Sequence, residues 1–325
     1  MNIAFAGLRH DHIFVLANLV RQHPDFSLCG WWEEDESARA AVSFAEPAYA
    51  SYEALLVDET VQAVAIGDYY GIRGQRVIQA LKAGKHVICD KPVCTSLEEL
   101  DEIEKLLDQT GLKLGCMLDL RYEACLRKLA QLVSEGLLGD IKTAAFTGQH
   151  PLNWGVRPGW YFEQGRHGGT FNDIAIHGVD AIGWITGQQW VKTLYARQWN
   201  AFAEHAPDFK DCAQCVGELK NGANVMADVS YAAPSPKGFL TPAYWRFTLW
   251  GTNGYAECRY GDPAVTLMLT GDPKPHSVQA PPTGDTCLTD FWRDVHGQST
   301  PFDTRSVLQS SRAALQLQHY ADQKG

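Results

Sequence analysis

The first 117 residues alternate between short apolar runs and stretches with helical periodicity, and this alternation limits the fold more than any other feature. Strands that alternate with helices pair in parallel, because each helix returns the chain to the same end of the sheet. We therefore predict an α/β unit with a parallel sheet. Thr95 or Ser96 is the expected start of its last helix, and Gly111 the expected end. The predicted strands cover 3–6, 26–32, 61–66, 86–89 and 113–117, and the predicted helices 12–20, 37–44, 52–58, 76–83 and 97–110.

Acidic residues follow several of these strands at their carboxyl ends, where a parallel sheet binds its ligands. Glu33 follows the second strand, at the spacing that lets a carboxylate accept hydrogen bonds from the ribose hydroxyls of an adenosine, and Asp68 follows the third. The run Glu33-Glu34-Asp35 would repel a 2′-phosphate, so it favours NAD over NADP. A solvated acidic loop would give the same run of charges.

The turn after the first strand departs from the glycine-rich pattern of dinucleotide-binding units. That pattern requires glycines at positions 7, 9 and 12, and the chain has Gly7, Arg9 and His12. Arg9 either turns outward or contacts a phosphate in place of lost N–H contacts. Asp11 would be unfavourable beside a phosphate unless it caps the following helix. We predict that Gly7, Leu8, Arg9 and His12 contact the cofactor.

Lys91 lies just after the fourth apolar run, in Asp90-Lys91-Pro92, and Pro92 restricts the backbone at this point. A lysine held in this way at the carboxyl end of a parallel strand points its ammonium group into the cofactor crevice. An ordinary lysine at a strand end would give the same sequence.

The pattern changes after Met117, so we expect a domain boundary near 118–122 and domains at 1–120 and 121–325. Runs of alternating character follow one another, and Asn221-Gly222 and Asn253-Gly254 are strong hairpin turns. We therefore predict that the second domain is an antiparallel or mixed sheet with helices on one face. Helices at about 286–297 and 303–320 are expected to close the chain.

One helix of this second part, in the stretch 168–180, carries three ionisable side chains at helical spacing. If the helix begins near Ile174 with Asn172 or Asp173 as its cap, then Asp173, His177 and Asp180 share one face. An imidazole between carboxylates is a tuned acid or base. A capping aspartate with a solvated histidine would give the same spacing.

The segment 150–167, just before that helix, is rich in aromatic and basic residues. Aromatic faces stack on the C–H surfaces of sugars, and Arg side chains donate to hydroxyl groups. Trp154, Arg157 and Trp160 are therefore candidate substrate contacts, with Arg121 at the domain junction as a further one. Core packing would also account for the two tryptophans.

Composition excludes several classes of partner. The formal net charge of −10 argues against nucleic acid and anionic membrane surfaces. No apolar run has the length of a membrane span, and no basic, apolar leader precedes the first strand, so we expect a cytoplasmic protein. The 9 cysteines are scattered, as in a reduced protein. Cys212 and Cys215 lack further ligands nearby, so we predict a strand there and no metal site.

The chain resembles the Gfo/Idh/MocA oxidoreductases over nearly its whole length. The resemblance rests on AGKHVICDKPVCTSLEELDEI, EGLLGDI and GGTFNDIAIHGVDAIGWITG. Asp90-Lys91-Pro92 stands where the family has Glu-Lys-Pro. The family's glycine-rich turn is replaced by GLRHDH, and GDYYGIRG lacks a histidine that is often present there. The resemblance implies a Rossmann NAD(P)-binding domain, followed by an α/β domain with a large, mostly antiparallel open sheet.

The resemblance also implies an activity and its residues. Family members mostly oxidise or reduce a hydroxyl of a sugar, cyclitol or related polyol, and commonly form homodimers or homotetramers through the open sheet. The catalytic lysine corresponds to Lys91 and the acid/base pair to Asp173 and His177, so Asp180 is the more structural of the three acid/base candidates. We expect His177 to accept the hydroxyl proton and Lys91 to stabilise the negative charge, in a cleft between the domains. An NAD-dependent glycosidase and a non-catalytic sugar- or protein-binding member are the alternatives.

Overall fold

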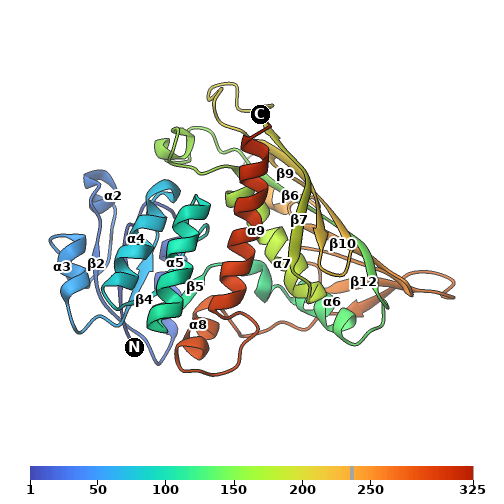
Figure 1. Ribbon diagram of the computed structural model, residues 1–325, viewed down its shortest axis with the longest axis horizontal. Helices are drawn as coiled ribbons and strands as arrows, with labels where there is room; N and C mark the ends of the chain where they lie inside the picture. The colour runs from blue at the N-terminus through green and yellow to red at the C-terminus, as the bar shows by residue number, and fades with distance from the viewer. Residues whose placement is uncertain (235–237, 325) are drawn as a thin grey trace. The chain divides into compact units, whose positions relative to one another are not determined.

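Two β-sheets organise the chain, and each forms the centre of its own unit (Figure 1). The computed structural model describes residues 1–234 and 238–324. The first unit combines Met1–Met117 with two later segments, Pro158–Gly168 and Thr286–Ser311, and the remaining described residues form the second unit. The chain therefore returns twice to the unit in which it begins.

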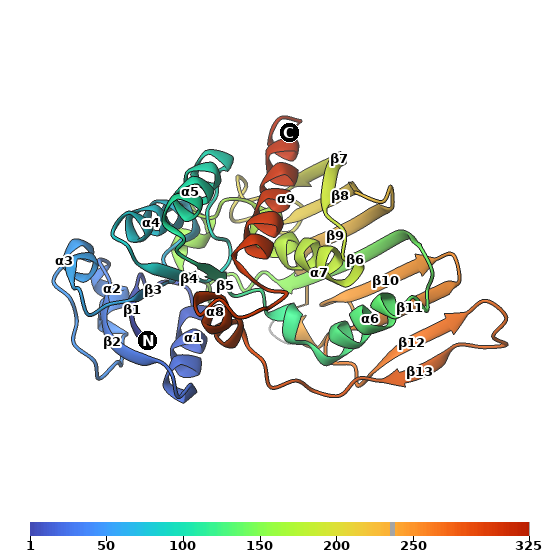
Figure 2. The ribbon, with the colours of Figure 1, turned by 60° about the horizontal axis from the view of Figure 1, so that its bottom comes forward.

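The first unit contains the predicted parallel sheet. Its five strands run in the order β2-β1-β3-β4-β5, and all its neighbouring pairs are parallel. Figure 2 shows α4 and α5 on one face of this sheet and α1 and α8 on the other. Because both faces are covered, every residue of β3 is buried, which explains why the strands read as continuous apolar runs. The strands are β1 (Asn2–Ala6), β2 (Ser27–Trp32), β3 (Ala63–Ile66), β4 (His86–Cys89) and β5 (Leu114–Cys116).

The helices of the first unit largely follow the sequence pattern. As predicted, α5 begins after Ser96, whose hydroxyl accepts a hydrogen bond from the Glu99 N–H, and ends at Gly111 in the left-handed region. The helix expected at 37–44 is shorter, because Phe44 instead packs its ring against Phe5 and other rings. The helices are α1 (His12–Gln22), α2 (Glu36–Ala40), α3 (Tyr52–Val57), α4 (Tyr70–Lys82), α5 (Leu97–Thr110) and α8 (Cys287–Val295).

The second unit is built on a mixed sheet of eight strands in the order β13-β12-β11-β10-β6-β9-β8-β7. Only β6 and β9 pair in parallel, and both predicted hairpin turns join antiparallel neighbours. Figure 2 shows α6 and α7 on the same face of this sheet. The strands are β6 (Ile141–Pro151), β7 (Trp190–Trp199), β8 (Cys212–Leu219), β9 (Asn224–Ala233), β10 (Arg246–Gly251), β11 (Gly254–Arg259), β12 (Ala264–Leu269) and β13 (His276–Gln279).

Helices and single helical turns complete the structure, and one of them corrects the sequence analysis. A π-helical turn, η3 (Phe171–Ala175), leads directly into α7. Asn172 and Asp173 are buried inside this turn, so neither caps a helix as we had expected. No helix among the described residues is both long and apolar enough to cross a membrane. The remaining elements are η1 (Asp119–Tyr122), α6 (Ala124–Ser134), η2 (Gly159–Phe162), α7 (Ile176–Thr186), η4 (Gly238–Leu240) and α9 (Thr304–Asp322).

Arg73 of α4 holds two strand ends of the parallel sheet together. Its side chain is completely buried, and its two terminal nitrogens donate to four backbone carbonyl oxygens. One acceptor follows β3 and the other three follow β4. A buried guanidinium is tolerated because these carbonyls replace its hydration. The acceptors are the carbonyls of Asp68, Asp90, Lys91 and Pro92.

Replacing Arg73 by Met should therefore destabilise the protein strongly. The substitution keeps an apolar stem but leaves buried carbonyls without donors, so we expect the free energy of unfolding to fall by about 3–5 kcal/mol. Urea denaturation measures the change. The matched control is Arg246→Met, which removes an exposed arginine paired with Glu257 and should change the unfolding free energy by no more than about 0.5 kcal/mol. Equal losses in the two variants would show that the four-carbonyl contact does not stabilise the fold.

Candidate active site

The turn between β1 and α1 is tied closely to the neighbouring strand ends. Gly7 has a φ of +69°, and a Cβ atom on it would lie 2.5 Å from the Cβ of Asp68, so only glycine fits. The Gly7 N–H donates to the carbonyl oxygen of Trp32, and the His10 N–H donates to that of Gly67. The turn is therefore fixed against the ends of both β2 and β3.

Glu33, at the end of β2, is buried and already binds the turn. Its carboxylate accepts hydrogen bonds from the Leu8 N–H at 2.5 Å, from the Arg9 Nε at 3.1 Å and from the Asp35 N–H at 2.8 Å. The carboxylate that was predicted to bind the ribose is thus held in place by the turn before α1.

Arg9 follows neither course that the sequence left open, because its guanidinium turns inward to carboxylates. One terminal nitrogen lies 2.9 Å from a Glu34 oxygen, and Nε lies 3.5 Å from an Asp68 oxygen. Burial alone would lower the pKa of Arg9, but the charges of Asp68 and Glu33 outweigh it and raise that pKa. Arg76 of α4 also contacts Asp68 and Glu34, at 3.6 and 3.0 Å. Two guanidiniums therefore offset much of the negative charge at this strand end.

The first turn of α1 lacks a side-chain cap. Asp11 occupies the N-cap position, but it is exposed and its carboxylate accepts no hydrogen bond from the helix. In the part of the chain that the structure describes, the N–H groups of Asp11 and His12 meet no protein acceptor. Uncapped N–H groups at the positive end of a helix dipole are suited to bind an anion. The Asp11 carboxylate, which does not cap the helix as the sequence analysis required, opposes an anion at this point.

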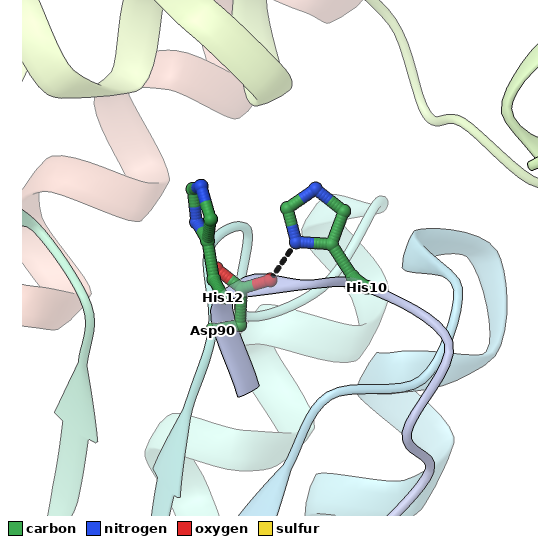
Figure 3. Close-up of side chains that lie close together, drawn as sticks. All are labelled: His10, His12 and Asp90. Carbon is green, nitrogen blue, oxygen red and sulfur yellow. Dashed lines mark hydrogen bonds and ion pairs between the residues drawn. The ribbon is translucent and has the colours of Figure 1, made fainter. Parts of the chain in front are cut away.

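Two histidines of this turn converge on the Asp90 carboxylate at the end of β4 (Figure 3). His10 Nδ1 lies 2.5 Å from one carboxylate oxygen, and His12 Nδ1 lies 3.1 Å from the other. Burial alone would raise the pKa of Asp90, but His10, His12 and Arg73 hold it well below its usual range. Burial lowers the pKa of His10 to about 4. His10 is therefore neutral near pH 7, and its Nδ1 must carry the proton that faces the carboxylate.

Two residues that were not predicted, His10 and Tyr70, link this cluster to Lys91. The Tyr70 hydroxyl lies 3.1 Å from His10 Nε2, and the buried Lys91 ammonium donates to the same hydroxyl at 3.5 Å. Asp90, His10, Tyr70 and Lys91 thus form a continuous polar chain. Nothing in the local sequence identifies His10 or Tyr70, because their partners are far away along the chain.

His10, His12 and Asp90 are also residue types that bind metal ions, and their ligand atoms lie within 4.8 Å of one another. However, the fully buried Arg73 guanidinium lies 3.4 Å from the Asp90 carboxylate. A cation added beside this guanidinium would meet a carboxylate whose charge is already balanced. We therefore interpret the cluster as a hydrogen-bonded network around the Arg73–Asp90 ion pair.

In the second unit, the π-helical turn and α7 present the predicted acid/base residues. Asp173 is buried and accepts a hydrogen bond from the Tyr231 hydroxyl of β9. His177 is 8% exposed, and its ring centroid lies 5.8 Å from that of Trp245. π-helical turns are frequent at functional sites. Tyr231 and Trp245 were not predicted, since sheet neighbours cannot be read from a single strand.

Asp180 has a structural role, as the sequence analysis expected. Its two carboxylate oxygens accept hydrogen bonds from Nε and a terminal nitrogen of Arg121, at 2.8 and 2.5 Å. Both side chains are buried, and this bidentate ion pair fixes α7 against η1. Arg121, a predicted substrate contact, is engaged in this pair.

The other predicted substrate contacts divide between the two units. Trp154 is 46% exposed in the second unit, with its ring centroid 5.4 Å from that of His205. Arg157 lies over the Tyr231 ring at 5.4 Å, next to the partner of Asp173. Trp160 instead belongs to the first unit and is buried there.

Comparison with known families covers both sheets. Residues 1–117 match the model of an oxidoreductase family with an NAD-binding Rossmann fold, and residues 126–257 match the GFO/IDH/MocA C-terminal domain. The chain belongs to the Gfo/Idh/MocA oxidoreductase family. Its first unit therefore contains the NAD-binding Rossmann domain of that family, as predicted.

Several curated relatives have similar sequences. An uncharacterized oxidoreductase, YrbE, from Bacillus subtilis is 26% identical over 280 residues, which are 82% of this chain and 78% of that protein. D-xylose dehydrogenase from Paenarthrobacter nicotinovorans is 29% identical over 46% of this chain and 38% of its own length. Myo-inositol 2-dehydrogenase from Thermotoga maritima is 28% identical over 46% of this chain and 43% of its own length.

Solved structures share the fold over the whole chain. A protein from Erwinia carotovora atroseptica superimposes with a TM-score of 0.88 at 24% identity, covering 99% of this chain and 98% of that one. An oxidoreductase from Agrobacterium radiobacter, crystallised with NAD+, L-tartaric acid and magnesium, gives a TM-score of 0.79 at 17% identity, with 100% and 97% covered. At these identities, the likeness establishes the α/β fold with its second, mostly antiparallel sheet.

The lowered pKa of His10 predicts a pH dependence of stability. The pKa of a histidine in an unfolded chain is about 6.5. Between about pH 6.5 and 4, His10 therefore binds a proton in the unfolded chain but not in the folded protein. The unfolding free energy should therefore fall as the pH falls through this range. Urea denaturation of His10→Asn should give a smaller loss, because Asn cannot take up that proton. All other histidines are common to both chains, so equal pH slopes would contradict the lowered pKa.

Proposed function

We propose that this family member is an NAD-dependent dehydrogenase that transfers a hydride between the nicotinamide and a hydroxyl-bearing carbon of a sugar, cyclitol or related polyol. The observation that carries the proposal is the β1–α1 turn. It binds Glu33 through its own backbone, and the N–H groups of Asp11 and His12 meet no acceptor among the described residues. These donors suit a pyrophosphate at the start of α1. The turn thus remains fit for a dinucleotide although two of the three pattern glycines are replaced.

The residues around this turn would hold the cofactor. We assign Gly7, Leu8, Arg9 and His12 to the pyrophosphate and Glu33 to the ribose. Asp68 and Lys91, which follow β3 and β4, are assigned to the same crevice. His12 is the best placed of the turn side chains to contact a phosphate, because its ring is 40% exposed and anchored to Asp90. When bound, NAD supplies the acceptor for the hydride.

Charge at the end of β2 favours NAD over NADP. Glu33, Glu34 and Asp68 face Arg9 and Arg76, so three carboxylates against two guanidiniums leave one negative charge. A 2′-phosphate carries about two negative charges near neutral pH and would be repelled. The two arginines make this repulsion weaker than the acidic sequence alone suggests.

The chain's own residues would manage the proton and the charge on oxygen. His177 accepts the hydroxyl proton as the hydride leaves, and Asp173, held by the Tyr231 hydroxyl, favours the imidazolium that forms. Lys91 places an ammonium group beside the reacting oxygen, where it stabilises the negative charge that develops. The polar chain through Tyr70 and His10 keeps that ammonium in position.

The substrate class rests on the relatives and on two side chains of the second unit. D-xylose and myo-inositol dehydrogenases are among the similar proteins. Arg157 and the exposed Trp154 offer a donor and an aromatic face for a polyol, whereas Arg121 acts by fixing Asp180. Exposed apolar side chains on strands of the eight-stranded sheet further support a homodimer or homotetramer through that sheet. These include Val191, Leu194, Tyr195 and Met226.

The cofactor assignment is tested by titration with NADH and NADPH. We expect saturable NADH binding in the micromolar to submillimolar range, and weaker NADPH binding because of the remaining negative charge. Isothermal calorimetry measures both affinities. Glu34→Gln removes one carboxylate and should narrow the difference between the two affinities. Tighter binding of NADPH by the natural chain would reverse the assignment, and binding of neither would point to a non-catalytic member.

The acid/base assignment is tested on His177. A panel of sugars, inositols and sugar acids, followed by the absorbance of NADH, first identifies a substrate. His177→Ala should then lower turnover about 10²- to 10⁴-fold, because a general base is lost, and should leave NADH affinity unchanged. The control is His276→Ala, which removes an exposed histidine of β13. Full turnover in His177→Ala would remove this residue from the mechanism.

A further inference from the structure

The segment Pro158–Gly168 follows β6 of the second unit but packs as part of the first unit. The Gly71 N–H, at the start of α4, donates to the carbonyl oxygen of Arg166 at 2.8 Å. The backbones approach so closely that a Cβ atom on Gly71 would lie 2.0 Å from the carbonyl oxygen of Gly165. The segment is therefore attached to the Rossmann domain by direct backbone contact.

Trp160 is the side chain by which this segment reaches the β1–α1 turn. It is 7% exposed, and its indole N–H donates to the carbonyl oxygen of Arg9 at 3.4 Å. Its ring centroid lies 6.2 Å from that of His10 and 5.2 Å from that of Tyr70. Trp160 thus contacts both the backbone of the turn and the polar chain that leads to Lys91.

These contacts compensate for the missing glycines of the turn. Arg9 and His12 replace two of the three pattern glycines, and their side chains pull toward separate acids, Glu33 and Asp90. The N–H groups of Asp11 and His12 are useful to an anion only if the turn keeps its present shape. A rigid indole that donates to the Arg9 carbonyl oxygen adds a contact from outside the turn that holds this shape.

We infer that Trp160 is a positioning residue of the cofactor site, which holds the Arg9–His12 turn in the form that binds the dinucleotide. This inference rests on the proposed function, since it assumes that the turn binds NAD. It also assigns Trp160 to the cofactor side of the chemistry, whereas the sequence placed it among the substrate contacts.

Two substitutions test the inference with NADH as the probe. Trp160→Phe keeps a ring but removes the N–H, and the loss of one hydrogen bond should raise the Kd for NADH about two- to tenfold. Gly71→Ala should also raise the Kd, because the added methyl group pushes the segment away without changing Trp160 or the turn. Trp250→Phe, which alters an exposed tryptophan of β10, is the control and should bind NADH normally.

Energy transfer from tryptophan to bound NADH, measured by fluorescence, reports directly whether Trp160 lies near the cofactor. Tryptophan emission overlaps the absorption of reduced nicotinamide, so bound NADH should be excited through a nearby indole. Trp160→Phe should lose a large share of this energy transfer at saturating NADH, and Trp250→Phe should lose little. Transfer that is unchanged in Trp160→Phe contradicts the placement of Trp160 at the cofactor.

The outcomes separate this inference from the proposed function. If the natural chain binds neither NADH nor NADPH, the proposed function fails and the inference fails with it. If the natural chain, Trp160→Phe and Gly71→Ala bind NADH equally, only the inference is overturned. Should either variant unfold, hydrogen exchange of the natural chain decides the question: NADH should increase protection of the peptide 158–168, and unchanged protection would overturn the inference.

Discussion

The first unit depends on how the buried Asp90 carboxylate is neutralised. Removing a carboxylate from water costs several kcal/mol unless charges and donors replace its hydration. Here His10 and His12 come from the turn before α1, and Arg73 comes from α4. A single acid at the end of β4 therefore fixes the turn and the start of two helices. A ligand of the turn would depend on these contacts too, because they hold in place the backbone N–H groups that would bind it.

The second unit uses the same physical device around α7. Asp173 is held by the Tyr231 hydroxyl, and Asp180 is held by the Arg121 guanidinium. Both acids are buried, so each needs its partner, and the two pairs fix the helix at its beginning and middle. His177 lies between them along the chain. The ring of His177 is therefore carried by a helix that cannot shift without separating a buried carboxylate from its partner.

Local sequence predicted whatever depends on local contacts. The five parallel strands, the Ser96 and Gly111 ends of α5 and both Asn-Gly hairpins follow from periodicity, capping and turn chemistry. The failures share a cause, since each depends on a partner distant in the chain. The 37–44 helix stops early as Phe44 packs against other rings, and the helix expected near 174 starts earlier, with a π-helical turn. The packing of Pro158–Gly168 on the first unit likewise leaves no mark in the segment itself.

The altered turn shows why the dinucleotide pattern failed as a local signal. In the usual pattern, glycines let the turn form with no help from elsewhere. In this chain, Arg9 is matched by Glu33, Glu34 and Asp68, and the histidines are matched by Asp90. A glycine restored at position 9 alone would leave three acids facing only the Arg76 guanidinium, and their mutual repulsion would disturb the end of β2. The residues that replace the glycines and their distant partners thus form one interdependent set. The glycine pattern is absent from the sequence, but long-range contacts of the replacing residues hold the turn instead.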